Sequence, residues 1–166
     1  MQPGETLGIA AQVAVTLAGF AGIVVVFRPD SIHRWSALDK SRLQLLLMNS
    51  ALPLAGSLFG LLLLALDPPP VGIWRWCSGV GFTAQLVVIA STGNPMRRIS
   101  RAELQNANKL LFYGIATLGM AAMALQVMNF ALWNRFWPFF ALIFMHLIAA
   151  LVQFVRMVLL PPHGSS

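Results

Sequence analysis

The residues of this chain that could do chemistry are few, and most lie within long apolar stretches. His146 is the one histidine inside such a stretch, and an imidazole can bind a quinone, carry protons or provide an axial ligand to a haem. A bis-histidine haem needs a partner at the same depth, whereas His33 and His163 lie outside the stretches. With a single cysteine, Cys77, the chain also gathers too few ligands for a metal site. We expect no cofactor and no metal, and a hydrogen bond from His146 to Gln126 or to a neighbouring helix.

Position along each stretch sorts the polar side chains into two layers, which we expect to converge inside a helical bundle. The outer layer is Gln12, Gln126 and His146, and the inner layer is Asn49, Gln85 and Gln153. Thr16 shares the stripe of Gln12, and Arg156 lies near the mouth of the inner layer. Such groups are ordinary packing contacts, worth about 0.6 kcal/mol each, whereas an ion route normally includes a buried acid. No Asp or Glu lies inside a stretch, which favours packing over a polar path.

The sequence motifs of common enzyme classes are absent from the chain. No GxSxG, HExxH, Walker loop, GxGxxG or CxxC occurs. We therefore expect a protein that is not an enzyme. A redox or lipid-modifying enzyme would have His146 as its one plausible functional group.

Five apolar stretches must position these residues, and together they take up about two thirds of the 166 residues. They cover residues 7–27, 45–66, 73–92, 110–133 and 138–160. Each has the roughly 20 apolar residues that a helix needs to cross a bilayer. Charged residues are 10% of the chain, against about 25% in soluble domains. We predict an all-α integral membrane bundle of five transmembrane helices, forming one domain over residues 1–166 with the lipid bilayer as its solvent.

The positive charges lie mainly on one side of these stretches. Nine of the 11 Lys and Arg residues fall there: Arg28, Arg34, Lys40, Arg42, Arg97, Arg98, Arg101, Lys109 and Arg156. The positive-inside rule then predicts the N-terminus outside and the C-terminus in the cytoplasm. Charges placed in short loops form no basic stripe, so we expect no binding of nucleic acid.

Tryptophan and arginine cluster at the two turns on the opposite side. Such clusters are typical of anchors at the membrane interface, and the alternative is a docking site for anionic lipid or a partner. The predicted anchors are Trp74, Arg75, Trp76, Trp133, Arg135 and Trp137.

Small residues mark where helices should approach one another. Gly56 and Gly60 form a GxxxG pair on one face of the second stretch, which Pro53 should kink. The first stretch carries two stripes on nearly opposite sides. One stripe is Gln12, Thr16 and Gly19, and the other is Ala14, Ala18 and Gly22. Two packing faces indicate a helix at the centre of the bundle, or one that also makes an oligomer contact.

The segment Val15–Gly22, of sequence VTLAGFAG, resembles the opening helix of a group of small polytopic bacterial inner-membrane proteins. Trp74–Ser78 and Gln153–Arg156 are similar to later patterns in that group. The resemblance implies a multi-pass protein of the bacterial inner membrane and brings no activity with it.

The function that we expect first is non-enzymatic and works through helix–helix contacts, as an accessory or assembly subunit or a structural homo-oligomer. Its partners would be other copies of the chain or another membrane protein. The alternative is a small ion or solute channel or transporter, with a polar path formed by the amides and His146.

Overall fold

The structure, a computed structural model, describes residues 2–27, 32–96 and 109–159. Five helices in these ranges are long and apolar enough to cross a membrane, which confirms the predicted all-α architecture. They are α1 (Pro3–Phe27), α2 (Ala37–Leu64), α3 (Ile73–Met96), α5 (Lys109–Met128), which continues into the π-helical segment η2 (Asn129–Trp133), and α6 (Phe136–Leu159). A short 3-10 turn, η1 (Ile32–Arg34), precedes α2.

Helix α2 begins eight residues before the apolar stretch predicted for it. Ser36 provides the reason, because its hydroxyl accepts a hydrogen bond from the backbone N–H of Asp39 at 3.1 Å and so caps the first turn. Asp39 also pairs with Arg42 at 3.3 Å, and both side chains are buried. The first two turns of α2 are therefore built from polar residues that hydropathy alone assigns to a loop.

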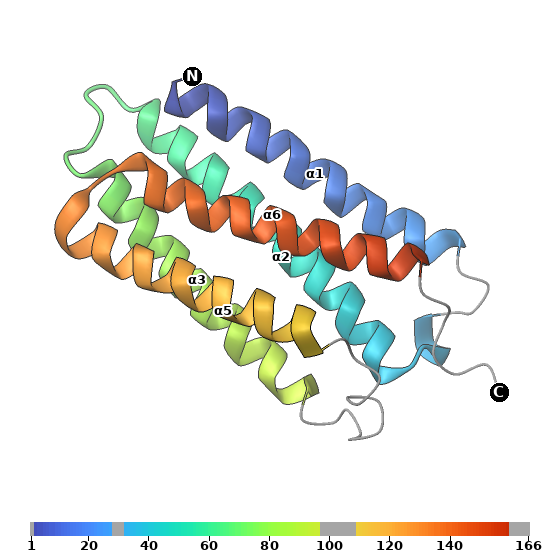
Figure 1. The fold of residues 1–166 in the computed structure, drawn as a ribbon. Helices are drawn as coiled ribbons and strands as arrows, with labels where there is room; N and C mark the ends of the chain where they lie inside the picture. The colour runs from blue at the N-terminus through green and yellow to red at the C-terminus, as the bar shows by residue number, and fades with distance from the viewer. Residues whose placement is uncertain (1, 28–31, 97–108, 160–166) are drawn as a thin grey trace.

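Helix α2 lies at the centre of the arrangement, where it packs along α1, α6 and α3 (Figure 1). Helix α5 packs against α6 and α3 instead. One end of the bundle carries the turns between α2 and α3 and between η2 and α6, and we call it the hairpin end. The opposite end carries Arg34, Lys40, Arg42 and Arg156, and we call it the basic end.

Small residues on α2 and α3 permit the closest contacts between helices. A Cβ added to Gly60 would lie 2.8 Å from the Leu7 side chain, and one added to Gly81 would lie 2.8 Å from Leu142. Gly56 faces the Phe139 ring, which would be 3.6 Å from an added Cβ. The GxxxG pair of α2 thus faces α1 and α6 within the chain.

The structure reverses the prediction for Gln12 and Thr16, which lie exposed on α1 rather than inside the bundle. The buried side of α1 is formed by Leu7, Ala10, Ala11, Ala14, Leu17, Ala21 and Val24. Thr16 needs no partner from the bundle, because its hydroxyl donates to the Gln12 carbonyl oxygen at 2.9 Å.

The other stripe of α1 does not form one continuous free face. Ala14 is fully buried, Ala18 is half-buried and Gly22 is exposed. Helix α1 packs on α2 and α6 and lies at the edge of the bundle rather than at its centre (Figure 1).

The predicted anchors all lie at the hairpin end. Trp74 is half-buried and packs its ring 4.9 Å from that of Phe136. The ring centroids of Trp133 and Trp137 lie 5.7 Å apart. Both residues are exposed, and so are Trp76, Arg75 and Arg135. Trp74 is therefore a packing residue, whereas the others are exposed, as the predicted anchoring at a membrane interface requires.

Candidate functional site

The hairpin end is held together by the side chain of Asn129, which is fully buried. Its amide nitrogen lies 2.8 Å from the Ser78 hydroxyl oxygen, 2.9 Å from the Arg135 carbonyl oxygen and 3.3 Å from that of Trp74. Its amide oxygen accepts from the backbone N–H of Arg135 at 2.8 Å. One side chain thus joins α3, η2 and the start of α6.

Gln126 adds a second tie at the same end. Its amide nitrogen donates to the Pro138 carbonyl oxygen at 2.7 Å and lies 3.3 Å from that of Ala122. The prediction that Gln126 would join His146 and Gln12 in one layer is therefore wrong. Pro138 lies eight residues before His146, about 12 Å along α6.

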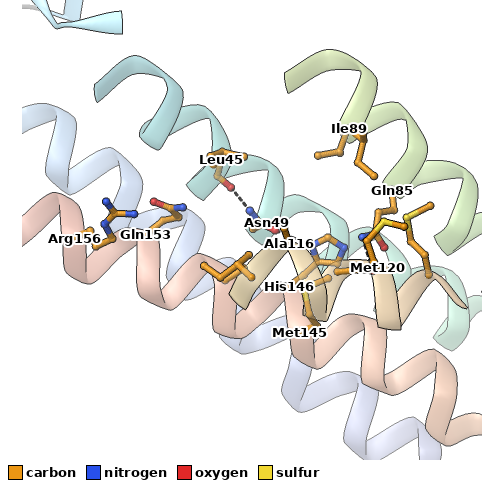
Figure 2. Close-up of a pocket in the computed structure, with 15 residues that line it drawn as sticks. Leu45, Asn49, Gln85, Ile89, Ala116, Met120, Met145, His146, Gln153 and Arg156 are labelled. Atoms are coloured by element: carbon orange, nitrogen blue, oxygen red, sulfur yellow. Dashed lines mark hydrogen bonds between the residues drawn. The ribbon is translucent and has the colours of Figure 1, made fainter. Parts of the chain in front are cut away.

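Toward the basic end α2, α3, α5 and α6 leave a pocket of about 400 Å³ between them (Figure 2). Most of its wall is apolar and rich in methionine: Leu45, Val88, Ile89, Ile115, Ala116, Gly119, Met120, Met123, Met145 and Ala149. Five polar side chains complete it, namely Asn49, Gln85, His146, Gln153 and Arg156. The pocket falls within the usual range of ligand sites, about 300–1,000 Å³.

His146 and Asn49 form the hydrogen bond that joins α6 to α2 in the wall of the pocket. The His146 Nδ1 lies 2.7 Å from the Asn49 Oδ1. The Asn49 amide nitrogen donates to the Leu45 carbonyl oxygen at 2.8 Å, which directs its oxygen toward the imidazole. An amide oxygen only accepts, so Nδ1 carries the proton and Nε2 is left as an acceptor in the neutral ring. Nε2 is buried and has no partner among the described residues.

Pro53 changes the backbone beside this bond. It lies within α2 and has no N–H to donate to the carbonyl of Asn49, four residues earlier. The helix therefore leaves one backbone acceptor without its usual partner at the level of the pocket.

Two glutamines present further acceptors to the pocket. The Gln85 amide nitrogen donates to the Gly119 carbonyl oxygen at 3.4 Å, which joins α3 to α5. The Gln85 Oε1 and the Gln153 Oε1 are both buried, and neither has a partner within the described ranges. In Figure 2, Asn49, Gln85 and His146 gather in one part of the pocket, with Gln153 and Arg156 farther along α6.

The structure therefore regroups the predicted polar residues. His146 pairs with Asn49, which the sequence assigned to the other layer, and the pocket brings both together with Gln85, Gln153 and Arg156. The layers were assigned from the position of each residue along its stretch, as if all stretches crossed the membrane at one level. That assignment could not take into account how far each side chain reaches along the bundle.

Exposed residues show where the pocket opens. Ile89 of α3 and Ala116 and Met120 of α5 line it and are also exposed on the outside of the bundle. Among the described residues, the rim thus lies between α3 and α5, along the flank that faces lipid. At the hairpin end, by contrast, Asn129 draws the same helices together.

No protein-family model matches the chain, and comparisons with curated proteins and with solved structures gave no match. The structure establishes a multi-pass helical membrane protein and assigns it to no family.

We predict that Asn49 and His146 are energetically coupled. Replacing either residue by Ala leaves a polar group of the other unpaired. The double variant should therefore lose less unfolding free energy than the two single variants lose together. The expected coupling is about 0.6–1.7 kcal/mol, the range for hydrogen bonds between membrane helices. Unfolding of the two single variants and the double variant in detergent measures it. His33→Ala combined with Asn49→Ala is the control and should be additive, because His33 is exposed.

Proposed function

We propose that this membrane protein binds a small molecule in the pocket between α2, α3, α5 and α6. One observation carries the proposal: of the five buried side-chain polar atoms that have no partner among the described residues, three belong to residues that line one pocket, His146, Gln85 and Gln153. A polar atom left unpaired in an apolar environment costs about 1–3 kcal/mol. A bound molecule that supplies the missing hydrogen bonds would recover this free energy.

The form of the pocket favours a binding protein or carrier over an open channel. Its polar residues lie in the half of the bundle toward the basic end, and the Asn129 contacts tie the helices at the hairpin end. A carrier needs a site that is closed on one side at a time, whereas a channel needs a continuous polar route. No catalytic step is part of the proposal, because the described residues that line the pocket include one imidazole and no carboxylate.

Filling the pocket should remove the bound molecule. Ala116→Trp places an indole at the rim, and we expect small molecules that co-purify with the wild-type protein to fall at least tenfold. Ala124→Trp is the matched control, since Ala124 is exposed on the same helix and lies outside this pocket. Organic extraction and mass spectrometry of the purified proteins measure the difference. Equal extracts from all three proteins would contradict the proposal.

The orientation proposed from the charges places the basic end in the cytoplasm of a bacterial cell, with the protein in the inner membrane. The observation behind it is the concentration of Lys and Arg on one side of the spans. The pocket then lies in the half of the membrane nearer the cytoplasm.

Cysteine labelling tests this orientation. In a Cys77→Ala background, Val71→Cys lies in the exposed turn of the hairpin end and Lys40→Cys lies exposed at the basic end. We expect a membrane-impermeant maleimide to label position 71 in intact spheroplasts, and position 40 after the membrane is permeabilised. The reverse pattern would invert the topology.

The exposed side of α1 supports a second candidate function, assembly with another copy of the chain or with a partner. Gly8, Gly19 and Gly22 have open space where a Cβ would stand, and Gln12 is exposed among them. Glycines allow close approach of a second helix. An amide both donates and accepts, so Gln12 can pair with its own copy across a two-fold axis. This is the accessory or homo-oligomer function expected from the sequence.

Bulky residues on this side of α1 should weaken assembly. We expect Gly19→Leu and Gly22→Leu to lower the associated fraction severalfold while membrane insertion is kept, because a side chain then separates the helices. Ala51→Leu, an exposed position on α2, is the control. Energy transfer between labelled copies in liposomes measures association, and an unchanged transfer efficiency in both variants would exclude this face.

A further inference from the structure

We propose that the pocket binds an uncharged amphiphile whose polar head donates hydrogen bonds, such as an alcohol or a diol. The inference rests on the proposed function and specifies the chemical class of the ligand. It follows from the direction of the polar atoms, the distribution of charge and the position of the rim.

The first step is the direction of His146. Its Nδ1 is engaged by the Asn49 amide oxygen, so the lone pair of the neutral ring is on Nε2, a buried atom without a partner among the described residues, on a side chain that lines the pocket. A ligand atom that meets Nε2 must therefore carry a hydrogen. A carbonyl or ether oxygen has none to give and would face another acceptor.

The second step is that Gln85, like His146, has a buried hydrogen-bond acceptor without a partner among the described residues. Its amide nitrogen donates one of its two hydrogens to the Gly119 carbonyl oxygen, and the buried acceptor is its Oε1. Gln85 and His146 stand on different helices, α3 and α6, and line the same pocket. Two acceptors on different helices match a head with two hydroxyl hydrogens. Gln153 provides a third acceptor about 10 Å farther along α6, seven residues from His146.

The third step concerns charge. The described residues that line the pocket include no Asp or Glu, so an ammonium head would meet no counter-ion among them. A carboxylate at the level of His146 would face the two acceptor atoms and gain no hydrogen bond from them. Among the described residues of the lining, Arg156 is the one side chain with a full positive charge, and it lies ten residues beyond His146 on α6. An uncharged donor therefore fits best at the level of His146.

The fourth step is the apolar part of the ligand. Met120, Met123 and Met145 line the pocket, and the flexible thioether side chain adapts to different apolar shapes. The rim at Ile89, Ala116 and Met120 faces the flank of the bundle. A hydrocarbon chain can leave the pocket there and remain in the lipid while its head stays bound.

A matched pair of probes tests the inference with the full chain in lipid nanodiscs. Dodecane-1,2-diol carries two donors, and 1,2-dimethoxydodecane has the same skeleton and none. We expect saturable binding of the diol, at least tenfold tighter than that of the ether, with empty nanodiscs as the blank for partition into lipid. With ¹⁵N-labelled histidine, the Nε2 resonance of His146 should shift with the diol and stay in place with the ether. His33, which is exposed, serves as an internal reference.

Variants separate the acceptors from the cavity itself. Gln85→Leu should weaken the binding of the diol about 3- to 10-fold, the effect of one lost hydrogen bond, and leave the affinity for the ether unchanged. Gln12 is exposed on α1, so Gln12→Leu should change the affinity for neither probe. Ala116→Trp should abolish saturable binding of both.

The outcomes distinguish this inference from the proposed function. Equal affinity for diol and ether, lost in Ala116→Trp, would overturn the donor class and keep the pocket as a binding site. If dodecanoate binds more tightly than the diol, and Arg156→Gln weakens the binding of dodecanoate, the pocket would be assigned an anionic ligand instead. An Nε2 resonance that shows a hydrogen bond before any probe is added, and does not respond to one, would assign ordered water only. Unsaturable binding of all three probes would overturn both the ligand class and the proposed function.

Discussion

Hydrocarbon offers no hydrogen-bond partner, and this constraint governs the polar side chains that are buried in the bundle. Asn129 meets it by contacting three neighbouring groups at the hairpin end, and the Gln126 amide nitrogen meets it through the Pro138 carbonyl oxygen. Toward the basic end, α2, α3, α5 and α6 leave the pocket between them. Of the five buried side-chain atoms that have no partner among the described residues, three belong to residues of this pocket, and the other two are the Gln126 Oε1 and the Ser57 Oγ.

Much of the fold follows from the sequence because its dominant signal is the length of apolar runs, which requires no knowledge of packing. Boundaries were harder to predict where polar residues form helix, as at Ser36 and Asp39, since capping overrides hydropathy there. The interior placement of His146 and Gln153 was predicted correctly on α6, where both are buried. On α1 the interior face was reversed, because both faces of the helix carry small residues and periodicity alone cannot rank two similar faces.

The pocket itself was only partly predictable. The sequence nominated Asn49, Gln85, His146, Gln153 and Arg156 as polar residues of the spans, and the structure assembles these five. It placed Gln126 in the outer layer, the side of the hairpin end, where the structure also has it. It could not reveal that His146 joins the inner residues instead, because this depends on the side chain that the imidazole reaches, here Asn49. The methionines of the wall carried no signal, since an apolar residue at the edge of a cavity resembles any other core residue. A cavity between four helices is a property of the whole bundle and leaves no local mark in the sequence.

The rim formed by Ile89, Ala116 and Met120 changes the meaning of affinity for this site. A molecule that arrives through the side of the bundle is drawn from the membrane, where partition has already concentrated it far above its level in water. Occupancy is then set by the mole fraction in the lipid, and a site with weak intrinsic affinity can be half filled. Desolvation of the hydrocarbon chain is complete before binding begins, so the discriminating free energy left to the protein is that of the head group. Selectivity in such a pocket depends on a few oriented polar atoms, and apparent affinity depends on partition of the molecule into the bilayer.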